Sequence, residues 1–210
     1  GGNHSLDSTQ RNGDNGCSPD WRLSYAQRWG RRSLPVGSYG LQTRVHPGNG
    51  TALQGPTDEY TDVAGDLQYQ YIGEDHLATL LATYIHESQT LNASVINQFA
   101  TRADHSLRTL RMTAEYMYQR RIGGTLGYFS TTGSKDELLY QPAPVTGSFI
   151  SGPDTSGFTA EVNYLPWLNT KLQLQYVWYQ KFNGLTTNYD GAGRNASGND
   201  TLYLLAWLNF

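Results

Sequence analysis

The chain has 210 residues, a formal net charge of −3 and 38% hydrophobic residues, and this length suits one domain. The small negative charge gives no reason to expect a nucleic-acid partner, and no apolar run reaches the ~18 residues of a membrane-spanning helix. An aromatic content of 12% argues against a disordered chain. The single cysteine, Cys17, leaves no partner for an internal disulfide and no CxxCH haem-attachment motif.

Residues 1–20 are polar and are expected to form a loop or leader before the first strand. From there on, period-two alternation and turn residues predict nine β-strands. Their expected ranges are 21–30, 36–46, 60–72, 77–89, 107–119, 122–130, 157–165, 171–181 and 201–210.

The alternation is clearest in 60–72, 107–119, 171–181 and 201–210, and it is weak in 21–30 and 36–46. In 107–119, Leu110 begins an apolar parity that lies opposite Arg111. In 201–210 one parity is wholly apolar and ends on Phe210 at the chain terminus. A strand of about ten residues with this pattern is long enough to cross a bilayer at a tilt of ~45°, and it is typical of the closing strand of a bacterial outer-membrane barrel.

The connections between the expected strands alternate strictly between short and long. Transmembrane barrels have short periplasmic turns and long extracellular loops, whereas a soluble sandwich has no reason to sort its loops in this way. The sequence therefore predicts an all-β fold, an antiparallel transmembrane β-barrel formed by one region over 1–210, in the bacterial outer membrane. The long connections are expected at 47–59, 90–106, 131–156 and 182–200.

The strand count suggests that the barrel continues upstream. If Phe210 lies at the periplasmic end, the long loops and residues 1–20 face outward, which is an awkward place for a barrel to begin. Nine is also odd, whereas bacterial single-chain barrels are even-stranded. We expect the chain to be the C-terminal part of a larger even-stranded barrel; the alternative is a miscount by one strand.

Two sets of candidate site residues follow from the parity. A polar parity with mixed charges is expected to line the lumen, either as a solute pathway or by pairing within the barrel wall. Its members are Asp66, Gln68, Gln70, Arg111, Glu115, Glu161, Asn163, Gln173 and Gln175. Aromatic side chains near strand ends are expected to be membrane-interface anchors. They are Tyr69, Tyr71, Tyr116, Tyr118, Tyr164, Trp167, Trp178, Trp207 and Phe210.

No motif predicts catalysis or a metal site. There is no Gly-x-Ser-x-Gly elbow, and histidines such as His76 and His86 lack metal-ligand spacing. The loop 188–200 is rich in glycine and oxygen ligands, but its spacing is not that of an EF-hand, and we interpret it as an exposed turn-rich loop. We therefore expect a non-enzymatic protein without a metal.

Four segments carry a family resemblance: 84–94, 123–129, 139–147 and 182–197. They resemble the C-terminal half of certain proteobacterial outer-membrane proteins described as cytochrome c-like, in which a CxxCH motif precedes the barrel. The resemblance covers roughly 70–210 and implies an outer-membrane barrel with further sequence upstream. Because CxxCH is absent here, no haem ligand carries over to any residue of this chain.

Three functions are compatible with these observations. The first is a porin-like outer-membrane barrel forming a polar-lined conduit, whose partners are outer-membrane lipid and the barrel-assembly machinery. The second, which the resemblance implies, is the barrel of an electron-transfer system, with no cofactor in this chain and haem supplied by missing sequence or a partner cytochrome. The third is a soluble all-β binding module.

Overall fold

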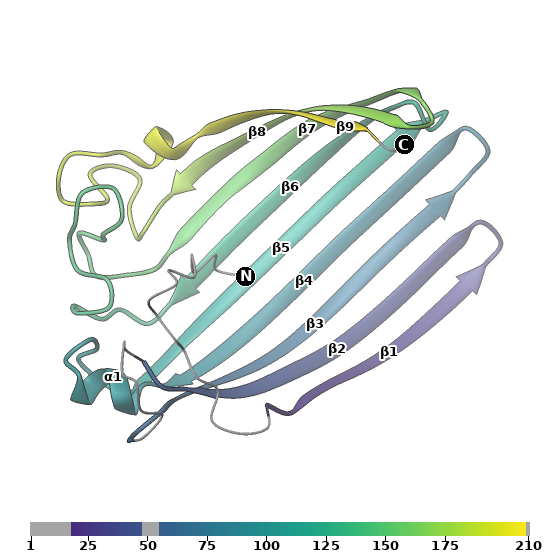
Figure 1. Ribbon diagram of the computed structural model, residues 1–210. Coiled ribbons are helices and arrows are strands. Elements are labelled where there is room, and N and C mark those ends of the chain that lie inside the picture. The colour runs from purple at the N-terminus through teal and green to yellow at the C-terminus, as the bar shows by residue number, and fades with distance from the viewer. Residues whose placement is uncertain (1–17, 48–54, 209–210) are drawn as a thin grey trace.

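The computed structural model describes residues 18–47 and 55–208, and in these residues the chain forms one antiparallel sheet (Figure 1). The nine strands follow one another in chain order, and each pairs with the next. Their bounds are β1 (Asp20–Trp29), β2 (Arg32–Val45), β3 (Asp58–Ile72), β4 (His76–Thr90), β5 (Asp104–Tyr118), β6 (Ile122–Gly133), β7 (Thr155–Trp167), β8 (Thr170–Lys181) and β9 (Thr201–Leu208).

All nine expected strands are confirmed, and the differences are at their ends. Several strands run further toward the long loops than expected; β5 begins at Asp104 rather than 107, and β6 continues to Gly133 rather than 130. Polar residues beyond the apolar stretch remain paired in the ladder, as Arg108 and Thr132 are. Alternation marks only the part of a strand with one apolar face, so it underestimates the length of such strands.

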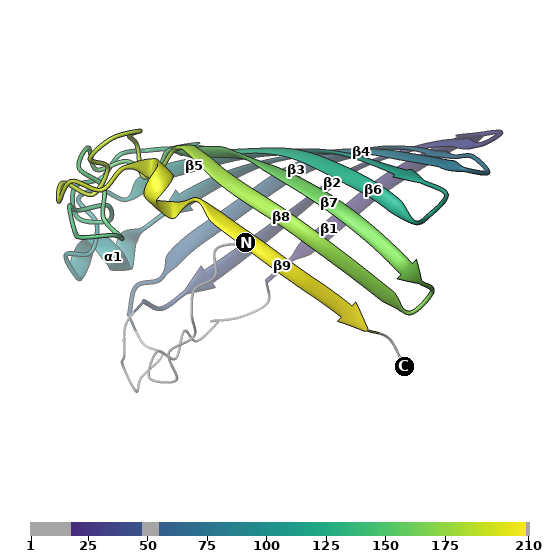
Figure 2. The same cartoon turned by 90° about the horizontal axis from the view of Figure 1, so that it is seen from above.

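The expected barrel is found only as a curved, open sheet. Figure 2 shows the strands bending into a trough, with β1 and β9 at its two edges. Among the described residues these two strands do not pair with each other. The coarser prediction, an all-β antiparallel sheet, is therefore confirmed, while closure and membrane insertion stay predictions.

Short turns lie at one end of the sheet and long loops at the other (Figure 1). The turn after β1 places Gly30 at φ +57°, and the turn after β5 holds both Gln119 and Arg120 at positive φ (49° and 55°). Two consecutive residues at positive φ are the signature of a type I′ hairpin turn, which glycine or asparagine usually provides. The β5–β6 turn therefore uses two residues that are uncommon in this conformation.

Most of the buried side chains lie at the long-loop end, while Ala64 and Asn163 are buried within strands. α1 (Asn92–Ile96) begins beside Asp58, whose carboxylate accepts hydrogen bonds from the backbone N–H groups of Ala93 and Ser94 at 2.9 and 3.0 Å. The β6–β7 and β8–β9 loops pack together around Tyr189, which is fully buried. A short 3-10 helix, η1 (Ala196–Asn199), precedes β9. We call the packed β4–β5, β6–β7 and β8–β9 connections the loop cap.

Candidate functional site

The strand register divides the sheet into two chemically different faces. Paired residues point to the same side of a sheet, so the pairs Glu161–Gln175 and Asn163–Gln173 lie on one face. Following the pairs from strand to strand brings all nine expected lumen residues to this side, which we call the polar face. Whether this face lines a lumen stays a prediction.

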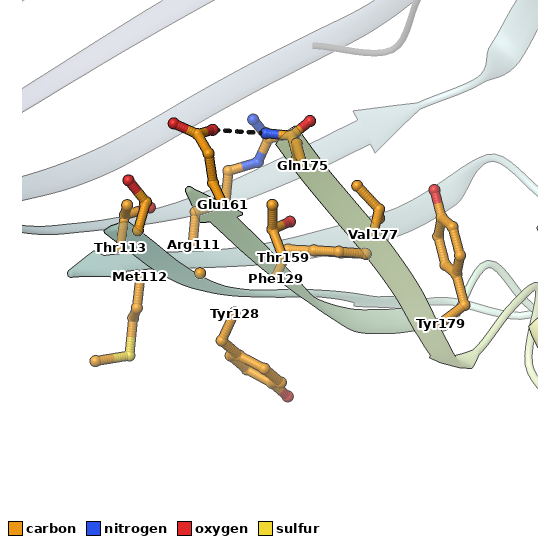
Figure 3. A pocket seen from close by; sticks show the side chains of 12 residues that line it. Arg111, Met112, Thr113, Tyr128, Phe129, Thr159, Glu161, Gln175, Val177 and Tyr179 are labelled. Atoms are coloured by element: carbon orange, nitrogen blue, oxygen red, sulfur yellow. Dashed lines mark hydrogen bonds between the residues drawn. The ribbon is translucent and has the colours of Figure 1, made fainter. Parts of the chain in front are cut away.

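A pocket of about 410 Å³ opens on the polar face across β5–β8. Figure 3 shows Arg111, Glu161 and Gln175 on the same side of the strands, while Met112 and Tyr128 point to the opposite side. Threonine hydroxyls from three strands complete much of the polar lining. The pocket therefore presents one cation, one carboxylate, an amide and several hydroxyls to whatever occupies this side of the sheet.

Glu161 is the centre of a hydrogen-bond network on β7 and β8. Its carboxylate accepts hydrogen bonds from Asn163 Nδ2 at 2.6 Å, Gln173 Nε2 at 2.6 Å and Gln175 Nε2 at 3.0 Å. The Lys171 ammonium lies 4.0 Å from the same carboxylate. Four of the residues in this network come from the polar parity expected from sequence, and their side chains pair with one another, as one of the two interpretations requires.

The remaining charges of the polar face are partly paired. Arg22 donates to Asp66 at 2.9 Å across the width of β2. Arg111 and Glu115, four residues apart on β5, have no hydrogen-bond or ion-pair partner among the described residues. These two groups are therefore free to meet solvent or a solute, as the other interpretation requires.

One wall of the pocket is aromatic. Phe129 pairs with Gly157, and a side chain at Gly157 would collide with the Phe129 ring at 2.6 Å. The glycine thus leaves room for that ring, which packs edge-on against Tyr179 at 5.5 Å between centroids. Tyr179 in turn contacts Phe182, and Phe182 contacts Tyr189 in the loop cap. A continuous row of rings connects the pocket to the loop cap.

The opposite side, which we call the apolar face, exposes large aliphatic side chains. Leu126 is 65% exposed and Leu204 81%, and between them a shallow groove of about 720 Å³ is lined almost wholly by apolar residues of β4–β9. A soluble protein rarely exposes so continuous an apolar surface. This side of the sheet therefore differs sharply in chemistry from the polar face.

Two groups of rings lie on the apolar face, on either side of the aliphatic residues. Toward the loop cap, Tyr128 packs against Phe158 at 5.1 Å and Phe158 stacks on Trp178 at 5.3 Å; we call these three residues the loop-side aromatic row. At the turn end, His76 contacts Tyr116 and Tyr118, and His76 Nδ1 lies 2.7 Å from the Tyr116 hydroxyl. The aliphatic residues are thus bounded by rings at both ends.

Most expected anchors lie on the apolar face. By register this holds for Tyr69, Tyr71, Tyr116, Tyr118, Tyr164, Trp167 and Trp178. Trp207 differs, because it pairs with Lys171 on the polar face, and Phe210 lies outside the described residues. Sequence reasoning missed Phe158, whose parity with Ala160 and Val162 was the available signal.

The loop cap is held by a buried carboxylate. Asp136 accepts hydrogen bonds from Thr101 N and Oγ1 and from the backbone N–H groups of Leu138 and Leu139, all within 3.0 Å, and His105 Nε2 lies 3.0 Å away. Burial alone would raise the pKa of Asp136, but these hydrogen bonds hold it well below its usual range. The carboxylate ties the β4–β5 loop to the β6–β7 loop.

A second carboxylate fastens the other half of the loop cap. The Asp190 side chain accepts hydrogen bonds from the backbone N–H groups of Val145, Ala192 and Arg194 at 3.1, 2.8 and 3.1 Å. Burial opposes ionisation, yet the three N–H donors lower the pKa of Asp190. The β6–β7 and β8–β9 loops are thereby joined, and within the loop expected to be exposed and turn-rich, Tyr189, Asp190 and Ala196 are buried.

No described group of three or more His, Cys, Asp or Glu side chains is arranged to hold a metal ion. None of the described helices is long and apolar enough to cross a bilayer. No family model matches the sequence, and no curated protein or solved structure matches it either. The resemblance to cytochrome c-like outer-membrane proteins therefore stays a prediction.

Proposed function

We propose that this sheet is part of a porin-like outer-membrane β-barrel that forms a polar-lined conduit. The observation that carries the proposal is the separation of the two faces: aliphatic side chains bounded by aromatic rows on one, hydrogen-bonded polar groups on the other. Transmembrane barrels need this arrangement, because the outer surface meets lipid and the inner surface meets water. The segment from Phe158 to Trp167 has the ~9–11 residues of a tilted spanning strand.

We infer that closure of the barrel involves further strands. β1 and β9 each leave one edge unpaired among the described residues, and both edges carry exposed apolar side chains such as Leu23 and Leu204. In a membrane such edges must be paired, since nothing else there can satisfy their backbone groups. We infer that additional strands join both edges and that the nine strands are one portion of a larger, even-stranded barrel.

Ion conductance in a planar bilayer tests the conduit. The full-length protein, purified in detergent and added at nanomolar concentration to a bilayer under voltage, is expected to give discrete current steps. The control is the same detergent without protein. A protein that inserts into vesicles yet gives no steps would contradict an open pore, and a native protein extracted without detergent would contradict the membrane location itself.

A second function, the barrel of an electron-transfer system, is favoured by the openness of the sheet. Barrel diameter grows with strand number, and nine strands that do not close belong to a barrel wide enough to admit a plug or partner. In that case haem would belong to a partner cytochrome or to other sequence of the protein. A haem absorbance band that co-purifies with the native complex would favour this function, and a haem-free complex would exclude it.

A further inference from the structure

A second polar pocket lies on the side of the sheet that carries the aliphatic residues. It has a volume of about 290 Å³ and lies where β5 and β6 meet the loop cap. Its lining residues are Ser106, Arg108, Thr132, Gly133, Ser134 and Asp154. None of them belongs to the polar face pocket, so the proposed conduit does not account for this site.

Arg108 occupies the first position beyond the aliphatic residues. On its face of β5 the next residue toward the short turns is Leu110, followed by Met112, while on the neighbouring strands it pairs with His86 and Thr132. A cationic side chain and a histidine thus lie side by side at the boundary between apolar and polar surface. In a membrane this boundary is at the level of the lipid headgroups.

The guanidinium of Arg108 has no hydrogen-bond or ion-pair partner among the described residues. Arg44 offers a direct comparison, since it lies on the same face of the sheet toward the loop cap and is also exposed. Its Nε donates to the Glu59 carboxylate at 2.9 Å. Arg108 is therefore left with its donors available, whereas those of Arg44 are partly occupied.

The pocket wall around Arg108 is fixed by hydrogen bonds between backbone and side chains. Ser106 N donates to Ser134 Oγ at 3.0 Å, and the Asp154 carboxylate accepts a hydrogen bond from Gly133 N at 3.1 Å. One oxygen of this carboxylate is thus bound to the backbone of β6, and the Asp154 side chain still lines the pocket. The Arg108 guanidinium and the hydroxyls of the lining serines and threonine remain as donors facing the pocket.

We propose that this pocket binds the phosphate group of a membrane lipid headgroup. A guanidinium binds phosphate through two parallel hydrogen bonds, and hydroxyl groups at its side supply further donors. The position at the headgroup boundary selects a lipid phosphate over a phosphate free in solution, because the acyl chains of that lipid would lie along Leu110 and the loop-side aromatic row. The proposal rests on the proposed function, since it requires this face to meet a bilayer.

Lipid retention by matched arginine variants tests the site. The full-length protein is reconstituted in phosphatidylcholine vesicles with and without diphosphoryl lipid A, and the lipid A that stays bound after detergent exchange is quantified by mass spectrometry. Arg108→Gln, which loses one charged pair of hydrogen-bond donors, is expected to bind lipid A about tenfold more weakly than the wild type. Arg44→Gln is expected to bind as the wild type does, and Arg108→Lys, which keeps the charge, is expected to lie between the two.

Three results would overturn the proposal. Equal losses in Arg108→Gln and Arg44→Gln would show a general effect of charge, and equal retention of dephosphorylated lipid A would show that the phosphate is not recognised. Thermal stabilisation of the wild type by inorganic phosphate alone, to the same extent as by lipid A, would show that the lipid is not the source. A protein that fails to enter either kind of vesicle would contradict the proposed function as well, whereas normal insertion without phosphate dependence would contradict this inference only.

Discussion

Thr125 and Leu126 are neighbours on β6 whose side chains point to opposite sides of the sheet, so an arginine at each position tests the proposed environment of each face. Leu126 is 65% exposed on the apolar face and pairs with Ala114 and Ala160. Thr125 lines the polar pocket and pairs with Glu115. The two variants therefore carry the same new side chain in the same strand.

The expected difference is large if the apolar face meets lipid. An arginine near the middle of a bilayer costs about 2–4 kcal/mol on the lipid-facing side of a barrel. Thr125→Arg brings its guanidinium near carboxylates instead, and we expect a change within about 0.5 kcal/mol. In water the exposed Leu126 would also tolerate arginine within about 0.5 kcal/mol, since no packing is lost there.

The measurement is the free energy of unfolding of the full-length protein in phosphatidylcholine vesicles, from reversible urea or guanidinium titrations followed by tryptophan fluorescence. We expect Leu126→Arg to lower it by about 2–4 kcal/mol relative to Thr125→Arg. Equal stabilities of the two variants would refute the assignment of the faces to lipid and water. A larger loss in Thr125→Arg would reverse the assignment.

Three further predictions concern the loop cap and the polar face. Asp136→Asn should destabilise the protein by about 3–5 kcal/mol, because the change disrupts a buried network that includes His105. Asp154→Asn, at a carboxylate that accepts one hydrogen bond, should cost about 1 kcal/mol. Denaturant titrations of both variants measure the difference. The pKa of Asp136 is lower in the folded than in the unfolded protein, so its ionisation stabilises the fold fully above the unfolded pKa of about 3.9. This stabilisation is lost as the pH falls toward the folded pKa. Below about pH 4 the free energy of unfolding should therefore fall with pH in the wild type, and Asp136→Asn should lack this slope. Glu161→Gln removes a negative charge that attracts a cation ~5 Å away by about 0.8 kcal/mol in water. The ratio of cation to anion permeability, measured from the reversal potential, should therefore fall by up to about fourfold. An unchanged ratio would place Glu161 outside the ion path.

The existence and order of the strands could be predicted because each has one apolar face, which gives an alternating sequence. The first two strands, where the alternation is weak, show why this pattern can be lost from a strand. β2 has Gly37 and Gly40 within it, and it includes Pro35, so little side-chain contrast remains between its faces. The ladder forms there nevertheless, because neighbours on both sides supply hydrogen-bond partners.

The placement of Trp207 could not be predicted from residue type alone. β9 is apolar on both parities: Leu202 and Leu204 lie on the apolar face, while Leu205 and Trp207 lie on the polar face opposite Gln173 and Lys171. An aromatic near a strand end is an anchor only if its parity points to lipid. Parity decides this, and the sequence carried the signal, because Trp207 has the parity opposite to the wholly apolar one that ends on Phe210.

The loop cap was beyond sequence reasoning for a different reason. Asp136 and Asp190 each bind nearby backbone N–H groups and one that is distant in sequence, that of Thr101 and that of Val145. Loop segments carry no periodic pattern that predicts the distant contacts. Residues expected to be an exposed turn-rich loop therefore include Tyr189, one of the most buried side chains. Glycine and asparagine content indicates turns, but it does not indicate whether those turns pack.

The distribution of buried surface supports an apolar medium around the sheet. The described residues that are both buried and hydrophobic lie mostly in the loop cap, and Ala64 is the one within a strand. Full burial of hydrophobic side chains, the main favourable contribution to folding in water, is thus rare in the nine strands. Backbone hydrogen bonds alone give a small net stabilisation in water because water competes for the same groups, whereas in a bilayer an unpaired backbone group costs several kcal/mol. A sheet that exposes Leu126 and Leu204 on one face and satisfies Glu161 on the other is therefore the arrangement that the proposed membrane location calls for.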